Sequence, residues 1–264
     1  MSPSAEAVES RDHFIKIWND MTLDRGGQIG AEDDLLTMWA ESTFGFWNSV
    51  TLTGVDTSPD DLSKQLSRTA AFMKSKSQAG YLWLFEDFLS SQARQELFSR
   101  ATEAGLELSF SGTGMAADLT IPEPQHPELE FRRVETDEEL VTYGEINRLA
   151  YGMRPEAGED ALAKSEFWRR KAFAYIGYRD GRPVTCAATI GGDNTIFLAL
   201  VATVPGQMRR GYGQAVSRKA IYEGIKQTGH QRVGLHATAA GRPVYERIGF
   251  PGDVTIHFFQ PAQG

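Results

Sequence analysis

The sequence of 264 residues has little cysteine and no long apolar run. Its one cysteine, Cys186, excludes an intramolecular disulfide and a zinc site built from several thiolates, so a reducing compartment and no metal are expected. No stretch approaches the roughly 18 uninterrupted apolar residues of a membrane span, and residues 1–20 lack a basic segment followed by an apolar one. These absences predict a cytoplasmic protein with no membrane partner.

The sequence also has fewer basic than acidic residues, with a net charge of -8 and an isoelectric point near 5.2. Nonspecific attraction to nucleic-acid phosphates requires clustered Lys and Arg, so no nucleic-acid partner is expected. The content of 41% hydrophobic and 23% charged residues is that of an ordinary globular chain, which excludes wholesale disorder.

Charge and proline divide the chain into two halves. Residues 1–127 have a net charge of -10 and residues 128–264 a net charge of +2. Between them lie Pro122, Pro124 and Pro127, which remove backbone donors and hold their predecessors extended. We therefore expect one domain at 1–127 and another at 128–264, the alternative being a long edge loop within one domain.

The first half predicts a strand–helix–strand–helix–strand order. The expected elements are strand 46–53, a helix that begins after Ser58 with Pro59 at its first position, strand 81–85, helix 91–104 and strand 106–110. No metal cluster, nucleophile elbow or phosphate loop is present in this half. An aromatic cluster is expected to be core, or alternatively to line an acceptor pocket: Trp39, Phe44, Phe46 and Trp47.

The second half predicts a mixed sheet. After a strand at 129–134, Thr136 and Glu139 form a capping box that begins a helix. Three strands at 173–178, 183–190 and 196–204 follow, joined by turns that contain glycine. The fold class is therefore α/β with a mixed sheet.

The strongest chemical signal is the passage from strand 198–204 through a glycine-rich turn into a helix. Gly211 and Gly213 allow positive φ or close approach of a ligand, and the helix directs unpaired N–H groups and its dipole at an anion. The third glycine of a dinucleotide fingerprint and the Lys of a Walker A loop are both missing. The turn alone therefore predicts either a pyrophosphate site or a tight structural loop.

A second segment, in which Tyr245 precedes Gly249 and Phe250, favours the pyrophosphate site over the structural loop. Together the two segments resemble the acetyl-CoA signature of the GNAT N-acetyltransferase superfamily, over roughly residues 129 to 260. The resemblance implies the GNAT acyl-CoA-binding fold in the second half. More weakly, the order of elements in the first half resembles that of two-domain GNAT enzymes with a degenerate N-terminal copy, which implies a tandem.

The resemblance also implies roles for individual residues. Val201, Ala202 and Thr203 would pair with pantetheine and polarise the thioester carbonyl of acetyl-CoA. The pyrophosphate turn would comprise Arg209, Arg210, Gly211, Tyr212, Gly213 and Gln214. Tyr245 would be the general acid that protonates the departing CoA sulfur, the alternative being a buried core tyrosine.

Two positions depart from the family pattern. Met208 stands where the signature begins with Arg or Gln, which removes one side-chain contact to a CoA phosphate. Val233 stands where some members carry a catalytic glutamate, so the general base is open between His236, Glu145 and other groups. Cys186 has no neighbouring His in the sequence to activate it and is expected in the core.

The predicted function is transfer of an acetyl group from acetyl-CoA to a primary amine of a small molecule, by direct attack in a ternary complex. A catalytically silent acyl-CoA-binding regulatory module and a peptide or protein N-terminal acetyltransferase are the alternatives. The acidic first half is expected either to attract a cationic amine or merely to keep the protein in solution. The acceptor, the acyl chain length and the oligomeric state stay open.

Overall fold

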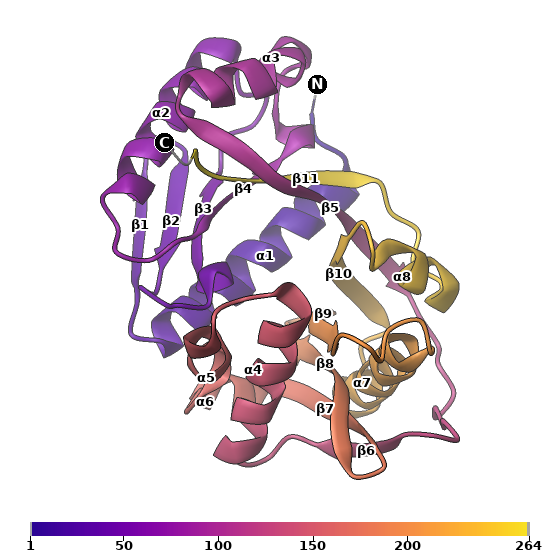
Figure 1. The fold of residues 1–264 in the computed structure, drawn as a ribbon. Helices are drawn as coiled ribbons and strands as arrows, with labels where there is room; N and C mark the ends of the chain where they lie inside the picture. Colours follow the sequence, from indigo (N-terminus) through magenta and orange to yellow (C-terminus); the bar gives the residue numbers. More distant parts are fainter. Residues whose placement is uncertain (1, 263–264) are drawn as a thin grey trace. The chain divides into compact units, whose positions relative to one another are not determined.

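The computed structural model describes residues 2–262, which divide into two compact units (Figure 1). Within the described residues, unit 1 comprises residues 2–114 and 252–262, and unit 2 comprises Met115–Pro251. The chain passes from unit 1 to unit 2 inside strand β5 (Leu106–Asp118), whereas the sequence placed the boundary in the three-proline segment that follows this strand. The difference arises because β5 extends eight residues beyond the expected strand 106–110, and because the C-terminal strand pairs within unit 1.

Unit 1 is an α/β unit with a mixed sheet. Its helices are α1 (Ala5–Asp24), α2 (Pro59–Lys74), α3 (Ser91–Glu103) and the 3-10 turns η1 (Gly45–Trp47) and η2 (Glu86–Phe88). Its strands are β1 (Gln28–Glu32), β2 (Leu35–Trp39), β3 (Asn48–Leu52), β4 (Tyr81–Phe85), the first part of β5 and β11 (Val254–Pro261). The strand order is β1-β2-β3-β4-β11-β5, in which only β3 and β4 pair in parallel.

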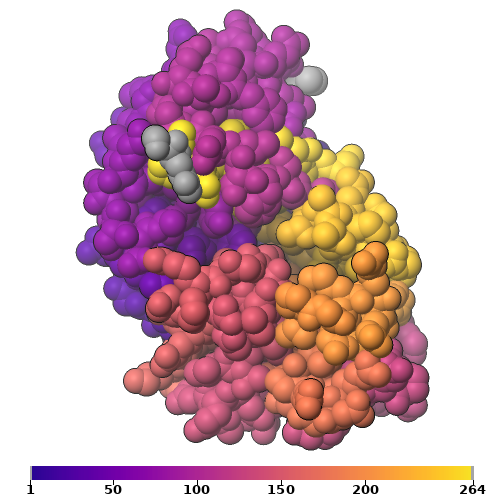
Figure 2. All heavy atoms as spheres, viewed as in Figure 1, coloured from indigo at the N-terminus to yellow at the C-terminus, as the bar shows by residue number. Residues whose placement is uncertain are grey.

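Strand β11 is inserted between β4 and β5 and is antiparallel to both. Figure 1 shows this strand in yellow among the indigo and magenta elements of unit 1, and its atoms are visible between theirs in Figure 2. Strand β11 therefore completes the sheet of unit 1, whose other strands all come from residues 28–118.

The alternation of side chains along β4 divides the core of unit 1 into two layers. Leu82 and Leu84 pack in the cluster formed by α2 and α3, whereas Trp83 stacks on Phe14 of α1 with ring centroids 4.3 Å apart. Of the aromatic cluster singled out in the sequence, Trp39, Phe44 and Trp47 are buried, so these rings are core. The order predicted for residues 46–110 is confirmed, while α1 and the β1–β2 hairpin were not predicted.

Unit 2 is also α/β, and the predicted mixed sheet is confirmed. Its helices are α4 (Asp137–Tyr151), α5 (Pro155–Leu162), α6 (Glu166–Lys171), α7 (Tyr212–Thr228) and α8 (Arg242–Ile248). Its strands are β6 (Glu130–Arg133), β7 (Ala172–Arg179), β8 (Arg182–Gly191), β9 (Ile196–Thr203) and β10 (Arg232–Thr238), with residues 115–118 of β5 beside β10. The strands β6 to β9 are consecutive antiparallel neighbours, and β10 pairs with β9 in parallel.

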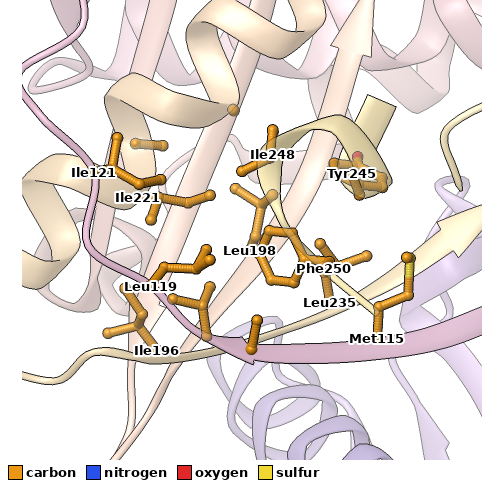
Figure 3. Packing of buried hydrophobic residues seen from close by; sticks show 14 of the residues in the cluster. Met115, Leu119, Ile121, Ile196, Leu198, Ile221, Leu235, Tyr245, Ile248 and Phe250 are labelled. Atoms are coloured by element: carbon orange, nitrogen blue, oxygen red, sulfur yellow. The ribbon is translucent and has the colours of Figure 1, made fainter. Parts of the chain in front are cut away.

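The two faces of this sheet carry different helices. Ala187 of β8 packs with Val216 and Ala220 of α7, whereas the adjacent Cys186 contacts Asn147 of α4. The large cluster beneath α7 and α8 includes Leu198, Leu235 and Tyr245 (Figure 3). The capping box of Thr136 and Glu139 at the start of α4 is present as predicted.

Among residues 2–262, no helix has the length and apolar character needed to span a membrane. In the same part of the chain, His, Cys, Asp and Glu side chains are nowhere gathered in threes with the geometry of a metal site.

Candidate functional site

Strand β9 contains the first element of the candidate site, a β-bulge. Leu200 and Val201 together face a single residue of β8, Ala187, because the register between these strands shifts at this point. Leu200 has a φ of 47°, in the left-handed region that costs a non-glycine residue about 1–2 kcal/mol. A strained residue at a bulge is common beside binding and catalytic sites, since it turns backbone groups out of the ladder.

The pairing of β9 with β10 ends just before the bulge. Their parallel pairing involves Ile196, Phe197 and Leu198 of β9, and within the described chain no pairing with β10 continues past Leu198. The other edge of the same segment stays paired with β8 as far as Thr203. Residues 199–203 therefore present one strand edge to which an extended ligand can add hydrogen bonds.

The turn after β9 ends at the N-terminus of the 17-residue helix α7. Its N-cap, Gly211, has a φ of 82° and offers no capping side chain. The first bond within the helix runs from Ala215 N–H to Gly211 O at 2.9 Å, so the N–H groups of Tyr212, Gly213 and Gln214 have no partner inside the helix. Three donors and the positive end of the helix dipole thus point the same way.

Gly213 packs this helix start against the end of β9. A Cβ at this position would lie 3.3 Å from Thr203 Oγ1, and that hydroxyl is in turn 2.9 Å from Thr185 Oγ1. The close approach places the expected pantetheine strand and the expected pyrophosphate turn in direct contact.

The backbone N–H of Tyr212 lies at the start of α7, whereas its side chain is buried. The ring is 1% exposed and packs with Leu129 and Val184, and its hydroxyl donates a hydrogen bond to Glu128 Oε2. This hydrogen bond raises the pKa of Tyr212 and lowers the pKa of Glu128. The side chain of Tyr212 therefore holds the first turn of α7 through these contacts, a role that the sequence did not reveal.

Arginine side chains lie at the turn between β9 and α7 or near it. Arg209 and Arg210 are exposed, and Arg209 has a φ of 60°. From the end of β7, Arg179 Nη1 donates to Gln207 Oε1 at 3.4 Å. After the hydrogen bond from Tyr212, attraction to Arg179 and Arg210 further lowers the pKa of Glu128. Arg179 was not predicted, because it is distant in sequence from the turn that it joins.

Tyr245 lies on α8 and is 7% exposed. Its ring meets Phe250 edge-on, with centroids 6.3 Å apart (Figure 3). Burial raises the pKa of Tyr245 far above the ordinary value, with smaller contributions from Tyr151 and Cys186. The hydroxyl is therefore protonated throughout the physiological range.

Two further tyrosines belong to this neighbourhood, and sequence reasoning gave neither a site role. Tyr143 is fully buried, and burial raises its pKa. Tyr151 is 38% exposed. Both lie on α4, which ends at Tyr151.

The candidates for a general base differ in what they contact. Both carboxylate oxygens of Glu145 accept hydrogen bonds from Arg148, at 2.6 and 2.5 Å, which ties this carboxylate to a cation. His236 is half-buried on β10 and its ring packs edge-on against Phe197 at 5.0 Å. Cys186 is buried and burial raises its pKa, so it belongs to the core as expected and is no acyl carrier.

Comparison with known proteins agrees with this geometry. Residues 128–250 match the model of the Acetyltransferase (GNAT) family. A GCN5-related N-acetyltransferase from Kribbella flavida is similar in structure, with a TM-score of 0.68, 18% identity, and coverage of 94% of this chain and 95% of that chain. One from Sphaerobacter thermophilus has a TM-score of 0.62 at 14% identity, with coverage of 88% and 78%. Comparison with curated protein sequences found no match.

The bulged strand, the open glycine turn and the family match together define the class of protein as an acyltransferase. Within that class, residues 128–250 belong to the GNAT acetyltransferase family. The similar structures extend the shared fold over both units, since the Kribbella protein covers nearly the whole of this chain.

Proposed function

We propose that unit 2 transfers an acetyl group from acetyl-CoA to a primary amine of a small molecule, by direct attack within a ternary complex. The observation that carries this proposal is the edge of β9 that β10 leaves unpaired, followed after the turn 204–211 by three N–H groups with no partner inside helix α7. Pantetheine would add to Val201, Ala202 and Thr203 as a strand, and the pyrophosphate would accept hydrogen bonds from Tyr212, Gly213 and Gln214.

Side chains would then supply charge around this backbone cradle. Arg209, Arg210 and Arg179 are placed near the turn, so the missing Arg or Gln at Met208 is offset by cations on either side. Met208 itself is 50% exposed.

In the proposed reaction, the neutral amine nitrogen attacks the thioester carbonyl carbon and a C–N bond forms. Negative charge moves to the carbonyl oxygen, where backbone donors at the β9 bulge would stabilise it. As the C–S bond breaks, the sulfur receives a proton from the Tyr245 hydroxyl, and the amine gives up a proton to a base. Burial raises the pKa of this phenol, so the hydroxyl carries a proton at neutral pH that it can donate to the sulfur as the C–S bond breaks.

Unit 1 would be a degenerate copy of the same fold. The succession β3-α2-β4-α3-β5 parallels β9-α7-β10-α8-β11, and in both cases the first two strands are parallel. The start of α2 differs from that of α7, however: Ser58 accepts a hydrogen bond from Asp61 N–H, and Asp60 and Asp61 bring negative charge. An anion would find this helix start capped and repulsive, so CoA would bind only to unit 2.

Calorimetry with CoA, followed by acetyl-CoA turnover against a panel of primary amines and peptides, tests the proposal. Released CoA can be followed with a thiol reagent, since the only protein thiol, Cys186, is buried. We expect micromolar CoA binding and turnover with small amines. Binding without turnover would favour a silent acyl-CoA module, turnover restricted to peptides would favour an N-terminal acetyltransferase, and absence of CoA binding would refute all three.

A further inference from the structure

The carbonyl group of Leu200, the strained residue of the bulge, accepts hydrogen bonds from two buried side chains. The hydroxyl of Tyr143 in α4 lies 3.0 Å from Leu200 O, and Cys186 Sγ in β8 lies 3.7 Å from the same oxygen. The Tyr143 hydroxyl is 3.4 Å from Ala199 O, so Leu200 O is its nearer acceptor. The bulge therefore directs this carbonyl toward α4 and away from the β8 ladder.

Asn147 forms hydrogen bonds with Cys186 and with the backbone of Tyr143. Its Nδ2 donates to Cys186 Sγ at 3.2 Å and to the carbonyl of Tyr143 at 3.1 Å. Asn147 is fully buried, and its Oδ1 has no hydrogen-bond partner among the described residues. A buried acceptor without a partner is unfavourable, which is consistent with a cluster whose arrangement serves a purpose other than stability.

The orientation of the Leu200 carbonyl determines that of the next N–H. A peptide group is planar and trans, so the carbonyl of Leu200 and the N–H of Val201 point in opposite directions. With the carbonyl held toward α4, the Val201 N–H is turned away from α4. Its direction thus depends on a hydroxyl in a helix more than fifty residues earlier in the chain.

Both donors keep their protons over the range in which the protein would work. Burial raises the pKa of Tyr143 above its ordinary value and likewise raises the pKa of Cys186. The carbonyl of Leu200 therefore always faces donors and never a phenolate or a thiolate.

We propose that Tyr143, assisted by Cys186, is a positioning residue that holds the Leu200–Val201 peptide so that the Val201 N–H donates to the thioester carbonyl of acetyl-CoA. This inference rests on the proposed function. It predicts that loss of one hydroxyl in α4 weakens polarisation of the bound thioester without weakening the binding of CoA.

The test compares wild type with Tyr143→Phe, using acetyl-CoA labelled with ¹³C at its carbonyl and infrared difference spectroscopy of the bound state. In wild type the carbonyl band should move to lower wavenumber on binding. In Tyr143→Phe that shift should fall by about half or more, and kcat with a reactive amine should fall about 10-fold or more, whereas the Kd for CoA changes by less than about 3-fold.

A packing control and a second variant make the test decisive. Trp168→Phe alters the ring that meets Tyr143 edge-on at 5.7 Å but keeps the hydroxyl, so it should lower stability and leave the infrared shift unchanged. Cys186→Ala removes the weaker donor and should reduce the shift less than Tyr143→Phe does, and it carries the test if Tyr143→Phe fails to fold.

The outcomes separate this inference from the proposed function. A wild-type shift that persists in full in Tyr143→Phe and Cys186→Ala overturns the role of Tyr143 and leaves acetyl transfer standing. Binding of acetyl-CoA to wild type with no shift also overturns it. Failure of wild type to bind acetyl-CoA at all overturns the proposed function, and the inference with it.

Discussion

Gly144 of α4 and Gly158 of α5 lie in direct backbone contact. A Cβ on Gly144 would overlap the carbonyl oxygen of Gly158 and lie 3.2 Å from the Cβ of Ala161. Neither obstacle is the mobile end of a long side chain, so the two helices would have to separate to admit a methyl group. The pair of glycines therefore sets the spacing of α4 and α5 in unit 2.

We predict that Gly144→Ala destabilises the protein by about 1–3 kcal/mol through overpacking, even though alanine favours the helix more than glycine does. Urea unfolding measures the effect. Leu149→Ala, on an exposed position of the same helix, is the control and should change the free energy of unfolding by less than about 0.5 kcal/mol. An equal or smaller loss for Gly144→Ala would show that the helices can move apart freely.

Several features of the helices in unit 2 have local signals in the sequence. The capping box at Thr136 and the left-handed Gly211 are local signals, and both features are present in the structure. Pro155 occupies the first turn of α5, a local signal of a helix start, but the short helix after it was not predicted. The start of this helix is therefore marked locally in the sequence.

The bulge at Leu200 is a different case. Leucine has no preference for positive φ, so nothing local marks this residue. Its carbonyl accepts hydrogen bonds from Tyr143 and Cys186, which come from other elements of unit 2. The strand could be placed from its apolar run, but the feature that gives the strand its chemical use is tertiary. The buried side chain of Tyr212 and the position of Arg179 escaped prediction for the same reason.

Gly211 offers a direct test of the anion cradle. We predict that Gly211→Glu lowers CoA affinity by about 100-fold or more, because a carboxylate would occupy the helix start proposed for the pyrophosphate. No atom lies within 4 Å of a Cβ built at Gly211, so the fold should persist despite the strain of a side chain at φ of 82°. Calorimetry with CoA measures the loss.

The matched control for this substitution is Gly229→Glu. Gly229 has a φ of 76° and an equally open Cβ position, but it caps the opposite end of α7. This variant should suffer similar strain and bind CoA as wild type does. If both variants bind CoA with wild-type affinity, the cradle is not at the start of α7.

The buried phenols predict a specific alkaline instability. Burial raises the pKa of Tyr143 and Tyr245 above the ordinary value of 10.0, so above about pH 10 the unfolded chain has lost protons that the folded protein keeps. The free energy of unfolding is therefore unaffected by these groups below about pH 10 and decreases as the pH rises beyond it, by about 1.4 kcal/mol per pH unit for each.

Urea unfolding between about pH 9 and pH 11 measures this slope. Tyr245→Phe should have a slope shallower by about 1.4 kcal/mol per pH unit, because one ionisable group is removed from the unfolded state. Identical slopes for wild type and Tyr245→Phe would mean that this phenol ionises in the folded protein as readily as in the unfolded chain.

The final prediction concerns Tyr245 as the acid of the proposed reaction. Tyr245→Phe keeps the ring against Phe250 and removes the hydroxyl alone. If that hydroxyl protonates the departing sulfur, kcat should fall by about 100-fold or more while acetyl-CoA affinity changes little. Some turnover should survive, since a thiol has a pKa near 8.5 and its thiolate is only a modestly basic leaving group.

Tyr175→Phe is the matched control, because Tyr175 belongs to the same hydrophobic cluster and is equally exposed, at 7%. Both variants lose one hydroxyl from that cluster, so a general loss of packing would lower their activities alike. A selective fall in kcat for Tyr245→Phe would identify the acid. Wild-type kcat in a folded Tyr245→Phe protein would instead identify Tyr245 as a packing residue, and the proton for the sulfur would have to come from water or from the attacking amine.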